Sequence, residues 1–277
     1  MEPWRDELYH HGIKGMKWGV RRFQNPDGSL TEAGRKRYGV QFYKEEKNVR
    51  ERCSNAPKDI SVQPINIGQV KARGKLKDQE ALECIEQADK VFKKAQKVEP
   101  QITNDILDAA NKTGNNMYGL NFRLKQPSSI AAKIGSDAKE DEVSFKDAAK
   151  GLKDVVRYTT VSEDSNFVSN YKKMKKELEK KGYSEEVCKN FFDLYNKGIV
   201  KHKSVQCTYK TPDGYKFEIQ FQTVKSQTAK ELKIPIYEAR RQAGLTDIQK
   251  KTLEDQMEAL AMRVTTPIDI DEIKTHK

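Results

Sequence analysis

The sequence contains little cysteine and histidine, and it has no long apolar run. The 4 cysteines are widely scattered, so they form neither a disulfide framework nor the paired spacing of a structural zinc site, and they indicate reduced thiols. The 4 histidines are too dispersed to predict a metal cluster. No apolar run approaches the ~20 residues of a membrane span, and the N-terminus lacks an apolar signal core. These absences favour a cytosolic protein that does not associate with a membrane.

Charge is abundant by contrast. Charged residues make up 34% of the 277 residues and the hydrophobic set 36%, which is enough for a packed core beneath a very polar surface. The formal net charge of +11 favours an anionic partner such as a nucleotide, a nucleic acid or an acidic protein surface.

Residues 1–40 differ in composition from the rest of the chain. They carry many glycines, cations and aromatics, with a strong turn signal at Asn25-Pro-Asp-Gly28. This mixture predicts an extended arm able to dock on a protein or nucleic acid, or a leader without a binding role. The run from Gly12 to Arg22 (GIKGMKWGVRR), followed by Asn25 to Tyr38, resembles a leader of bacteriophage and prophage head-region proteins of Gram-positive hosts. The resemblance implies a phage-encoded protein of the host cytoplasm that is packaged in the virion or attached to it, with head or portal proteins as partners of residues 1–40.

The pattern of apolar residues divides the remainder. Residues 41–75 have little periodicity and are predicted to be a linker, 76–265 form the main domain, and 266–277 are a tail. An amphipathic stripe predicts a helix over 78–97, which Pro100 should end before a second short helix over 102–111. Further helices are predicted over 144–151, 163–181, 185–196, 226–243 and 246–263.

Strand signals are fewer and stronger. Residues 152–161 are rich in β-branched and aromatic side chains, and Asp154 stands near their start. Two β-rich runs, 204–209 and 215–223, flank Thr211-Pro-Asp-Gly214 and predict a hairpin. The second run alternates cleanly: Phe217, Ile219 and Phe221 should face the core, and Glu218, Gln220 and Gln222 the opposite side. That polar row fits a cleft or an ordinary solvated sheet face.

A basic loop precedes a capped helix between Arg123 and Lys133. Pro127 interrupts the chain, and Ser128 or Ser129 is predicted to cap the following helix, so the loop presents cations and backbone N–H groups to an anion. Read alone, the loop is more typical of a solvated connection than of a binding site. If Asp154 and Glu218 lie on neighbouring strands facing it, the two carboxylates would hold Mg²⁺ against bound phosphates.

These residues follow the order of motifs in a known family. Arg123, Lys125, Ser129, Ile130 and Lys133 match Arg-x-Lys-x-x-x-Ser-Ile-x-x-Lys, Asp154 matches a metal-binding Asp, and Glu218–Thr223 matches Glu-Ile-Gln-x-x-Thr. The stretch 105–264 therefore resembles the synthetase domain of the RelA/SpoT family, the alarmone pyrophosphokinases and their toxin relatives. The resemblance implies a nucleotidyltransferase-like α/β (α+β) fold, in which helices flank a mixed, mostly antiparallel sheet of about five strands.

The resemblance also implies roles for individual residues. Arg123, Lys125, Ser129 and Lys133 would hold the triphosphate of the donor, ATP. Asp154 and Glu218 would bind Mg²⁺, Glu218 would activate the acceptor hydroxyl, and Gln220 would support the metal site. The implied reaction moves the β,γ-pyrophosphate of ATP to a 3′-hydroxyl of an acceptor nucleotide or of a tRNA or other RNA 3′ end.

The sequence departs from the family at three places. The family's arginine after the metal Asp falls on Thr159, with Arg157 nearby as a substitute. The acceptor-binding segment has no clear counterpart in 197–204, where His202 is a partial replacement, and Gln222 stands where arginine or histidine is usual. Two hypotheses follow: a pyrophosphotransferase or toxin-like effector with its own acceptor, and a non-enzymatic phage head or assembly protein that keeps the fold.

Overall fold

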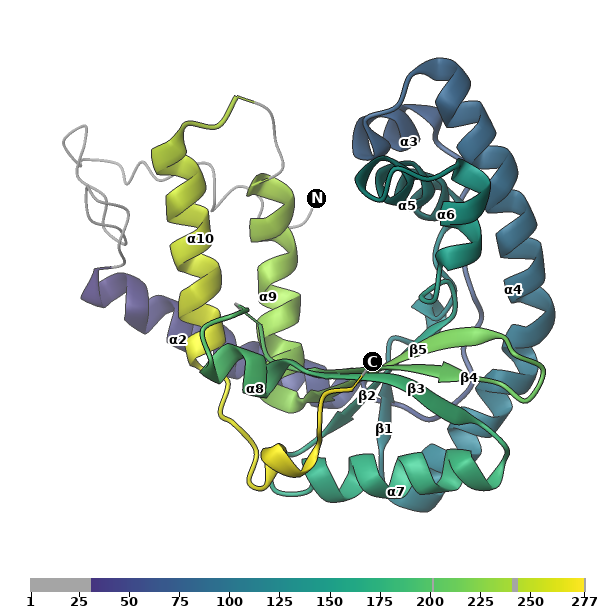
Figure 1. Ribbon diagram of the computed structural model, residues 1–277. Coiled ribbons are helices and arrows are strands. Elements are labelled where there is room, and N and C mark those ends of the chain that lie inside the picture. Colours follow the sequence, from purple (N-terminus) through teal and green to yellow (C-terminus); the bar gives the residue numbers. More distant parts are fainter. Residues whose placement is uncertain (1–30, 201, 241–243, 277) are drawn as a thin grey trace.

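The computed structural model describes residues 31–200, 202–240 and 244–276, and a five-stranded sheet lies at its centre (Figure 1). The strands are β1 (Asn116–Tyr118), β2 (Arg157–Ser162), β3 (Ser184–Asn190), β4 (Val205–Lys210) and β5 (Lys216–Thr223), in the order β1-β2-β5-β4-β3. Only the β2–β5 pair is parallel among the described strands. The predicted α+β fold with a mixed, mostly antiparallel sheet is confirmed.

The hairpin of β4 and β5 forms as the sequence predicts. Gly214 adopts φ 83°, and its N–H donates to the carbonyl of Thr211, which closes the turn. Phe217, Ile219 and Phe221 are almost completely buried, and Glu218 lies on the other face, partly exposed. The alternation of apolar and polar residues therefore fixes the register of this strand.

The helix predicted over 185–196 is wrong in its first half. That half is β3, and only Phe191–Asn196 (α8) is helical. β3 pairs with β4 on one side, and on the other Cys188 exchanges two backbone hydrogen bonds with His276. Pairing on both sides outweighs the helix-compatible charges of this segment, because it satisfies the backbone polar groups.

The break predicted at Pro100 is also wrong. α4 runs without interruption from Asp78 to Thr113, 36 residues or about 54 Å. Pro100 lies on the exposed side of α4, whereas Ala95, Ile102 and Ile106 are buried against the rest of the protein. Packing on both sides of the proline holds the two halves in one helix despite its cost of about 3 kcal/mol.

Residues 41–75 are not the irregular linker predicted for them. They include most of α2 (Glu32–Arg52) and all of α3 (Ile67–Gly74). The Thr31 hydroxyl caps α2 by accepting from the Gly34 N–H. The extended-arm prediction is thus wrong for 32–40, and residues 1–30 lie outside the described part of the chain.

The other helices lie close to their predicted positions. They are α5 (Pro127–Glu140), α6 (Phe145–Gly151), α7 (Phe167–Lys180), α9 (Val224–Arg240) and α10 (Asp247–Met262), with 3₁₀ turns η1 (Leu120–Phe122) and η2 (Ile270–Glu272). α7 begins after Asn166, later than predicted. No described helix is both long and apolar enough to span a bilayer.

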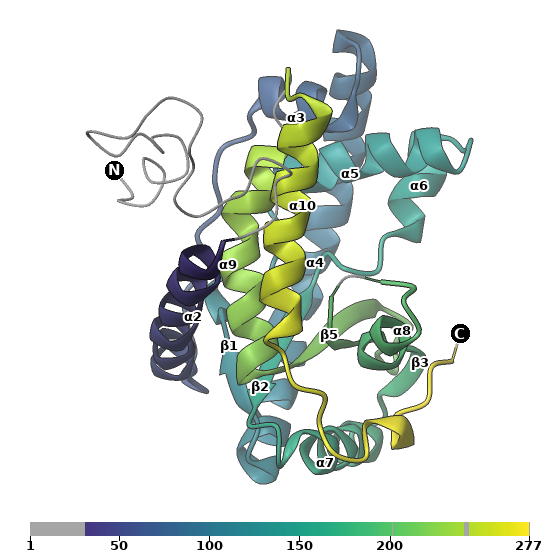
Figure 2. The same ribbon diagram turned by 90° about the vertical axis from the view of Figure 1, so that its left-hand side faces the viewer.

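Helices cover the two faces of the sheet differently. α7 and the C-terminal part of α4 cover the apolar face, where Tyr171 packs edge-on against Phe221 with ring centroids 5.0 Å apart. On the other side, Figure 1 shows α3, α5 and α6 rising at one end of the sheet and α9 and α10 at the other. Figure 2 shows α9 and α10 packed alongside each other, with α2 against α9. The polar face of β5 lies on the side from which these two groups of helices rise.

Candidate functional site

Three chain segments meet where β2 begins. Leu124 forms an isolated antiparallel bridge with Val156, and the Lys125 N–H donates to the Val155 carbonyl at 2.9 Å. On the other side, the Glu218 N–H donates to the Val156 carbonyl at 3.1 Å. The basic loop, the segment that carries Asp154 and the start of β5 are therefore neighbours. The prediction that Asp154 lies on the strand is wrong, because β2 begins only at Arg157.

Lys125 and Asp154 form a direct ion pair. Lys125 Nζ lies 2.7 Å from Asp154 Oδ2, and the two side chains are only 21% and 19% exposed. Asp154 lies in the loop ahead of β2, and its Oδ1 is buried without a hydrogen-bond partner among the described residues. One oxygen of this carboxylate is therefore neutralised by lysine, and the other has no donor.

Charge and burial act in opposite directions on this pair. Burial tends to raise the pKa of Asp154, but the charge and hydrogen bond of Lys125, together with Lys133 and Arg157, outweigh burial and hold that pKa below its usual value. Burial also lowers the pKa of Lys125, although Asp154 opposes the shift. Asp154 is thus an ionised carboxylate at neutral pH, surrounded by three cations.

Ser129 and Lys133 lie one turn apart on α5. The helix begins with Pro127 at its first position and Gln126 as its N-cap. The predicted serine cap is therefore wrong, and the Ser128 hydroxyl instead accepts from the Asn66 N–H at 2.9 Å. Ser129 is partly exposed, and Lys133 Nζ is 3.6 Å from Asp137 on the same helix.

Arg123 does not join this cluster. Its Nε lies 2.5 Å from Glu99 Oε1, and its Nη1 donates to the carbonyls of Lys58 and Leu120. Glu99 is 5% exposed and lies on α4, so the arginine neutralises a buried carboxylate. Arg123 therefore links α4 to the basic loop. Its role as a phosphate ligand stays a prediction.

A second polar group lies on β5. Arg157 and Glu218 are partners in the β2–β5 register, as are Thr159 and Gln220, so these side chains share one face. Gln220 Nε2 donates to Glu218 Oε1 at 2.6 Å, and Lys230 Nζ of α9 donates to Gln220 Oε1 at 2.7 Å. Gln220 thereby holds Glu218 in place, and α9 supplies a cation behind it.

Lys230 carries no signal in the sequence that would single it out. Burial, with Arg157 as a further contribution, lowers its pKa from 10.5 to about 8. It reaches the site because α9 packs against β5, which brings Lys230 next to Gln220. The two residues are ten positions apart, and no pattern in the sequence specifies how the helix leaves the strand.

Arg157 connects the two groups. Its charge affects the pKa of Asp154 on one side and of Lys230 on the other. Its guanidinium makes no hydrogen bond or ion pair with the described residues, so its donors are available for an anion. The substitution of Arg157 for the family's usual arginine remains a prediction.

The segment expected to choose an acceptor is only partly polar. The ring of His202 lies on Phe191, with centroids 4.3 Å apart, and Lys203 Nζ lies 4.3 Å above the Tyr195 ring while donating to the Val264 carbonyl. Lys201 lies outside the described residues. Gln222 is buried and accepts from the Ser226 hydroxyl, so it supports the β5–α9 junction.

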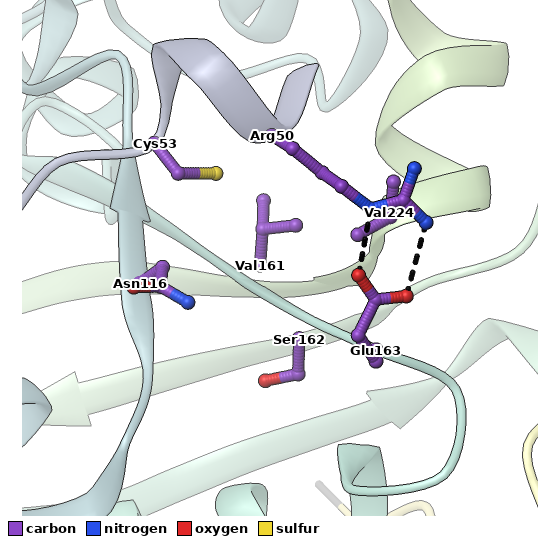
Figure 3. Close-up of a pocket in the computed structure, with 7 residues that line it drawn as sticks. All are labelled: Arg50, Cys53, Asn116, Val161, Ser162, Glu163 and Val224. Atoms are coloured by element: carbon purple, nitrogen blue, oxygen red, sulfur yellow. Dashed lines mark hydrogen bonds and ion pairs between the residues drawn. The ribbon is translucent and has the colours of Figure 1, made fainter. Parts of the chain in front are cut away.

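A pocket of about 270 Å³ lies elsewhere, at the far end of β2 from Asp154 (Figure 3). It is lined by Val161, Ser162 and neighbouring residues of α2, β1 and α9, and Arg50 closes one side through an ion pair with Glu163 at 2.7 Å. It contains none of the residues that the sequence singles out.

The donor set around Asp154 fits Mg²⁺. This cation prefers carboxylate oxygens and keeps much of its water, so one or two protein carboxylates are enough. The unpartnered Oδ1 of Asp154 is an acceptor that lacks a positive partner, and the partly exposed Glu218 carboxylate is the other candidate ligand.

Comparisons with known proteins give partial likenesses. Residues 1–25 match a family of unknown function (DUF7211), and no curated protein matches the sequence. Among solved structures, the small alarmone synthetase 1 of Bacillus subtilis, bound to its product pppGpp, is 15% identical with a TM-score of 0.36, covering 50% of this chain and 70% of that chain. The Type VI effector Tas1, in complex with its immunity protein, is 17% identical with a TM-score of 0.38, covering 62% and 95%. Because these superpositions are partial, the roles of individual side chains follow from the geometry of this chain alone.

Proposed function

We propose that this protein is a Mg²⁺-dependent pyrophosphotransferase of the RelA/SpoT type, which transfers the β,γ-pyrophosphate of ATP to a 3′-hydroxyl and releases AMP. The observation that carries the proposal is the Lys125–Asp154 pair with its unpartnered carboxylate oxygen, near enough to the charges of Lys133 and Arg157 for them to lower the pKa of Asp154. A largely buried carboxylate in such a positive environment suits a site that receives a metal ion and a polyphosphate together.

Each residue of the cluster has a chemical part in this proposal. Lys125, Lys133 and the Ser129 hydroxyl bind the triphosphate, and Arg157 neutralises charge that develops during transfer. Asp154 and Glu218 hold Mg²⁺, which would polarise the phosphoryl oxygens when bound. Glu218, held by Gln220, accepts the proton of the attacking hydroxyl. Arg123 contributes by fixing the loop to Glu99.

Binding of ATP requires the Lys125–Asp154 pair to open. The phosphates would then bind the ammonium group of Lys125, and Asp154 would be a ligand of the metal ion, so that neither of the two charges would lack a counter-charge. The pair thus holds both side chains at the site while the substrate is absent.

The remaining parts of the proposal concern the acceptor and the leader. The acceptor is a nucleotide or a tRNA 3′ end, as in a toxin-like effector. Residues 1–40 are proposed to be a leader that attaches the protein to phage head or portal proteins, either in the host bacterial cytoplasm or in the particle. The division into a leader, residues 41–75, a main domain over 76–265 and a tail over 266–277 is proposed with it.

Transfer of label tests the enzymatic proposal. The full chain is incubated with Mg²⁺, γ-labelled ATP and, in separate reactions, GDP, GTP, AMP, ATP or uncharged tRNA. We expect one acceptor to take label, and Glu218→Gln and Asp154→Asn to lower the transfer by about 10³-fold. Asp141→Asn, an exposed carboxylate at the end of α5, serves as the matched control and should keep full activity.

The alternative, a non-enzymatic head or assembly protein, predicts a different outcome. No acceptor would take label, calorimetry would detect no ATP binding, and the chain would copurify with phage particles at fixed stoichiometry. ATP binding that Lys125→Met abolishes would exclude that alternative.

A further inference from the structure

Three potential metal ligands gather at the opposite edge of the sheet. One ligand atom each from Glu185, Cys188 and His276 lies within 4.8 Å of the other two. The sequence gives no sign of this group, because His276 follows Cys188 by 88 positions and no short-range spacing joins them.

Backbone pairing brings the three side chains together. Cys188 and His276 exchange two hydrogen bonds, of 3.0 and 2.9 Å, so their side chains lie on the same face of neighbouring strands. The register shift of β3 between Glu185 and Val187 inserts one extra residue, which turns Glu185 to the face of Cys188. Without that bulge, residues three apart on a strand would point to opposite faces.

The thiol of Cys188 is suited to a ligand. Both backbone groups of Cys188 are used by His276, so its pair with Cys207 of β4 is of the type without hydrogen bonds, in which side chains approach most closely. The free thiol is buried, and the Tyr171 hydroxyl, which also donates to Glu185, lies 3.7 Å from its sulfur. A thiolate is the form that binds metals.

The histidine and the carboxylate face each other in an arrangement that favours a cation between them. His276 Nδ1 lies 3.3 Å from the Lys274 carbonyl, and with the proton on Nδ1 the lone pair of Nε2 is directed at Glu185 Oε1, 3.6 Å away. A backbone carbonyl behind the ring is the usual support of a metal-binding histidine.

The surroundings of Glu185 allow an exchange of cations. Its side chain is 1% exposed, and Lys175 Nζ neutralises Oε1 at 2.8 Å. Oε2 accepts from the hydroxyls of Tyr171 and Tyr209 at 3.0 and 2.9 Å, which fixes the carboxylate. Lys175 is 33% exposed on α7, so its ammonium group can move to solvent when a metal takes its place.

We propose that Glu185, Cys188 and His276 bind a divalent cation of the zinc class, with a fourth position left to water. One sulfur, one imidazole nitrogen and one carboxylate oxygen form a mixed donor set that Zn²⁺ and Co²⁺ accept and that Mg²⁺ does not. The site is separate from the one at Asp154, and it joins the C-terminal segment to β3.

Cobalt substitution tests the site. The full chain carrying His10→Ala and His11→Ala, which removes the histidines of the leader, is titrated with Co²⁺ under reducing conditions. We expect one equivalent to bind with a thiolate-to-cobalt charge-transfer band that Zn²⁺ abolishes. Cys188→Ser should remove the band, and Cys53→Ser, a partly exposed thiol on another element, should keep it.

Two further variants distinguish a metal site from an ordinary buried ion pair. His276→Ala changes an exposed side chain and keeps the backbone pairing, and it should weaken binding about 10- to 100-fold. Lys175→Gln removes the competing cation and should tighten binding, whereas a purely structural pair predicts no metal affinity in either variant. Absence of the charge-transfer band, or loss of both thiols to a Cys188–Cys207 disulfide with no metal uptake when reduced, would overturn the proposal.

Discussion

The carboxylates of Asp154, in the loop before β2, and of Glu185, on the outer strand β3, are neutralised in different ways. Asp154 has a single lysine on one oxygen and no hydrogen-bond partner on the other among the described residues. Glu185 receives a lysine and two tyrosine hydroxyls over both oxygens. Asp154 therefore has to release one lysine to take a metal ligand, whereas Glu185 is held by three donors.

The difference follows from the elements that surround each group. Asp154 lies in the loop between α6 and β2, and the charges of Lys125, Lys133 and Arg157 lower its pKa. Glu185 lies on a strand beneath α7, whose Tyr171 and Lys175 face the sheet from one helix side. The loop at the strand end therefore leaves one carboxylate oxygen without a donor, and the packed strand face supplies donors to both oxygens.

Loss of the Glu185 charge should have the largest effect on stability. Glu185→Gln leaves Lys175 without its partner and two tyrosine hydroxyls with a weaker acceptor, and we expect the free energy of unfolding to fall by about 3–5 kcal/mol. Urea unfolding in chelator-treated buffer measures the change. Glu186→Gln, which affects only a partly exposed carboxylate one position away, is the control, and an equal loss in both variants would contradict the comparison.

Loss of the Asp154 charge should lower the rate of pyrophosphate transfer more than it lowers stability. Asp154→Asn removes a metal ligand and is expected to lower pyrophosphate transfer by about 10³-fold, equivalent to about 4 kcal/mol. Glu185→Gln, assayed where it is still folded, should retain transfer within a few-fold. Comparable losses of activity in the two variants would show that the two carboxylates do not have separate roles.

The pH dependence of stability tests the environment of Lys230. Its folded pKa of about 8 lies below the ordinary 10.5, so between these values the unfolded chain binds more protons and stability should rise with pH. The full gain from this one group is about 3 kcal/mol. Lys230→Met should lack that gain. Urea unfolding at pH 8 and at pH 10 measures how the free energy of unfolding changes with pH. The same change in the variant and in the wild type would refute the lowered pKa of Lys230.

Substitution of Lys133 should have the smallest effect on stability. Its ion pair with Asp137 is long, at 3.6 Å, and partly exposed to solvent, so Lys133→Ala should change the free energy of unfolding by less than about 0.5 kcal/mol. The same variant should weaken ATP binding several-fold by calorimetry, because it removes one of the cations near Asp154. Lys139→Ala, on the same helix with its ammonium bound to Glu80 and the Lys75 carbonyl, should leave ATP affinity unchanged.

Part of the fold and of the site follows from local patterns. The alternation of Phe217, Ile219 and Phe221 predicts β5 and the face on which Glu218 lies, because a strand has a period of two. The spacing from Lys125 to Lys133 predicts which residues stand on the basic loop and on the first turns of α5. Asp154 is recognisable as an aspartate beside a strand, which a sheet interior would disfavour.

Other features depend on long-range contacts that no local pattern encodes. β3 contains two glutamates and a lysine that suit a helix, and its strand exists because β4 and the C-terminal segment pair with it. α4 continues through Pro100 because buried residues on both sides pack against the sheet and α5. Arg123 turns to Glu99 because that carboxylate is buried and needs a cation.

The sequence by itself determined the hairpin, most of the helices and the identity of the charged residues around Asp154 and Glu218. Those features depend on turn chemistry, on periodicity and on the order of residues along the chain, which are local. Only the tertiary structure decided which charges meet: Lys125 with Asp154, Arg123 with Glu99, Lys230 with Gln220, and Glu185 with Cys188 and His276. A buried charge takes the counter-charge that packing places beside it, and packing brings together residues that are distant in the chain.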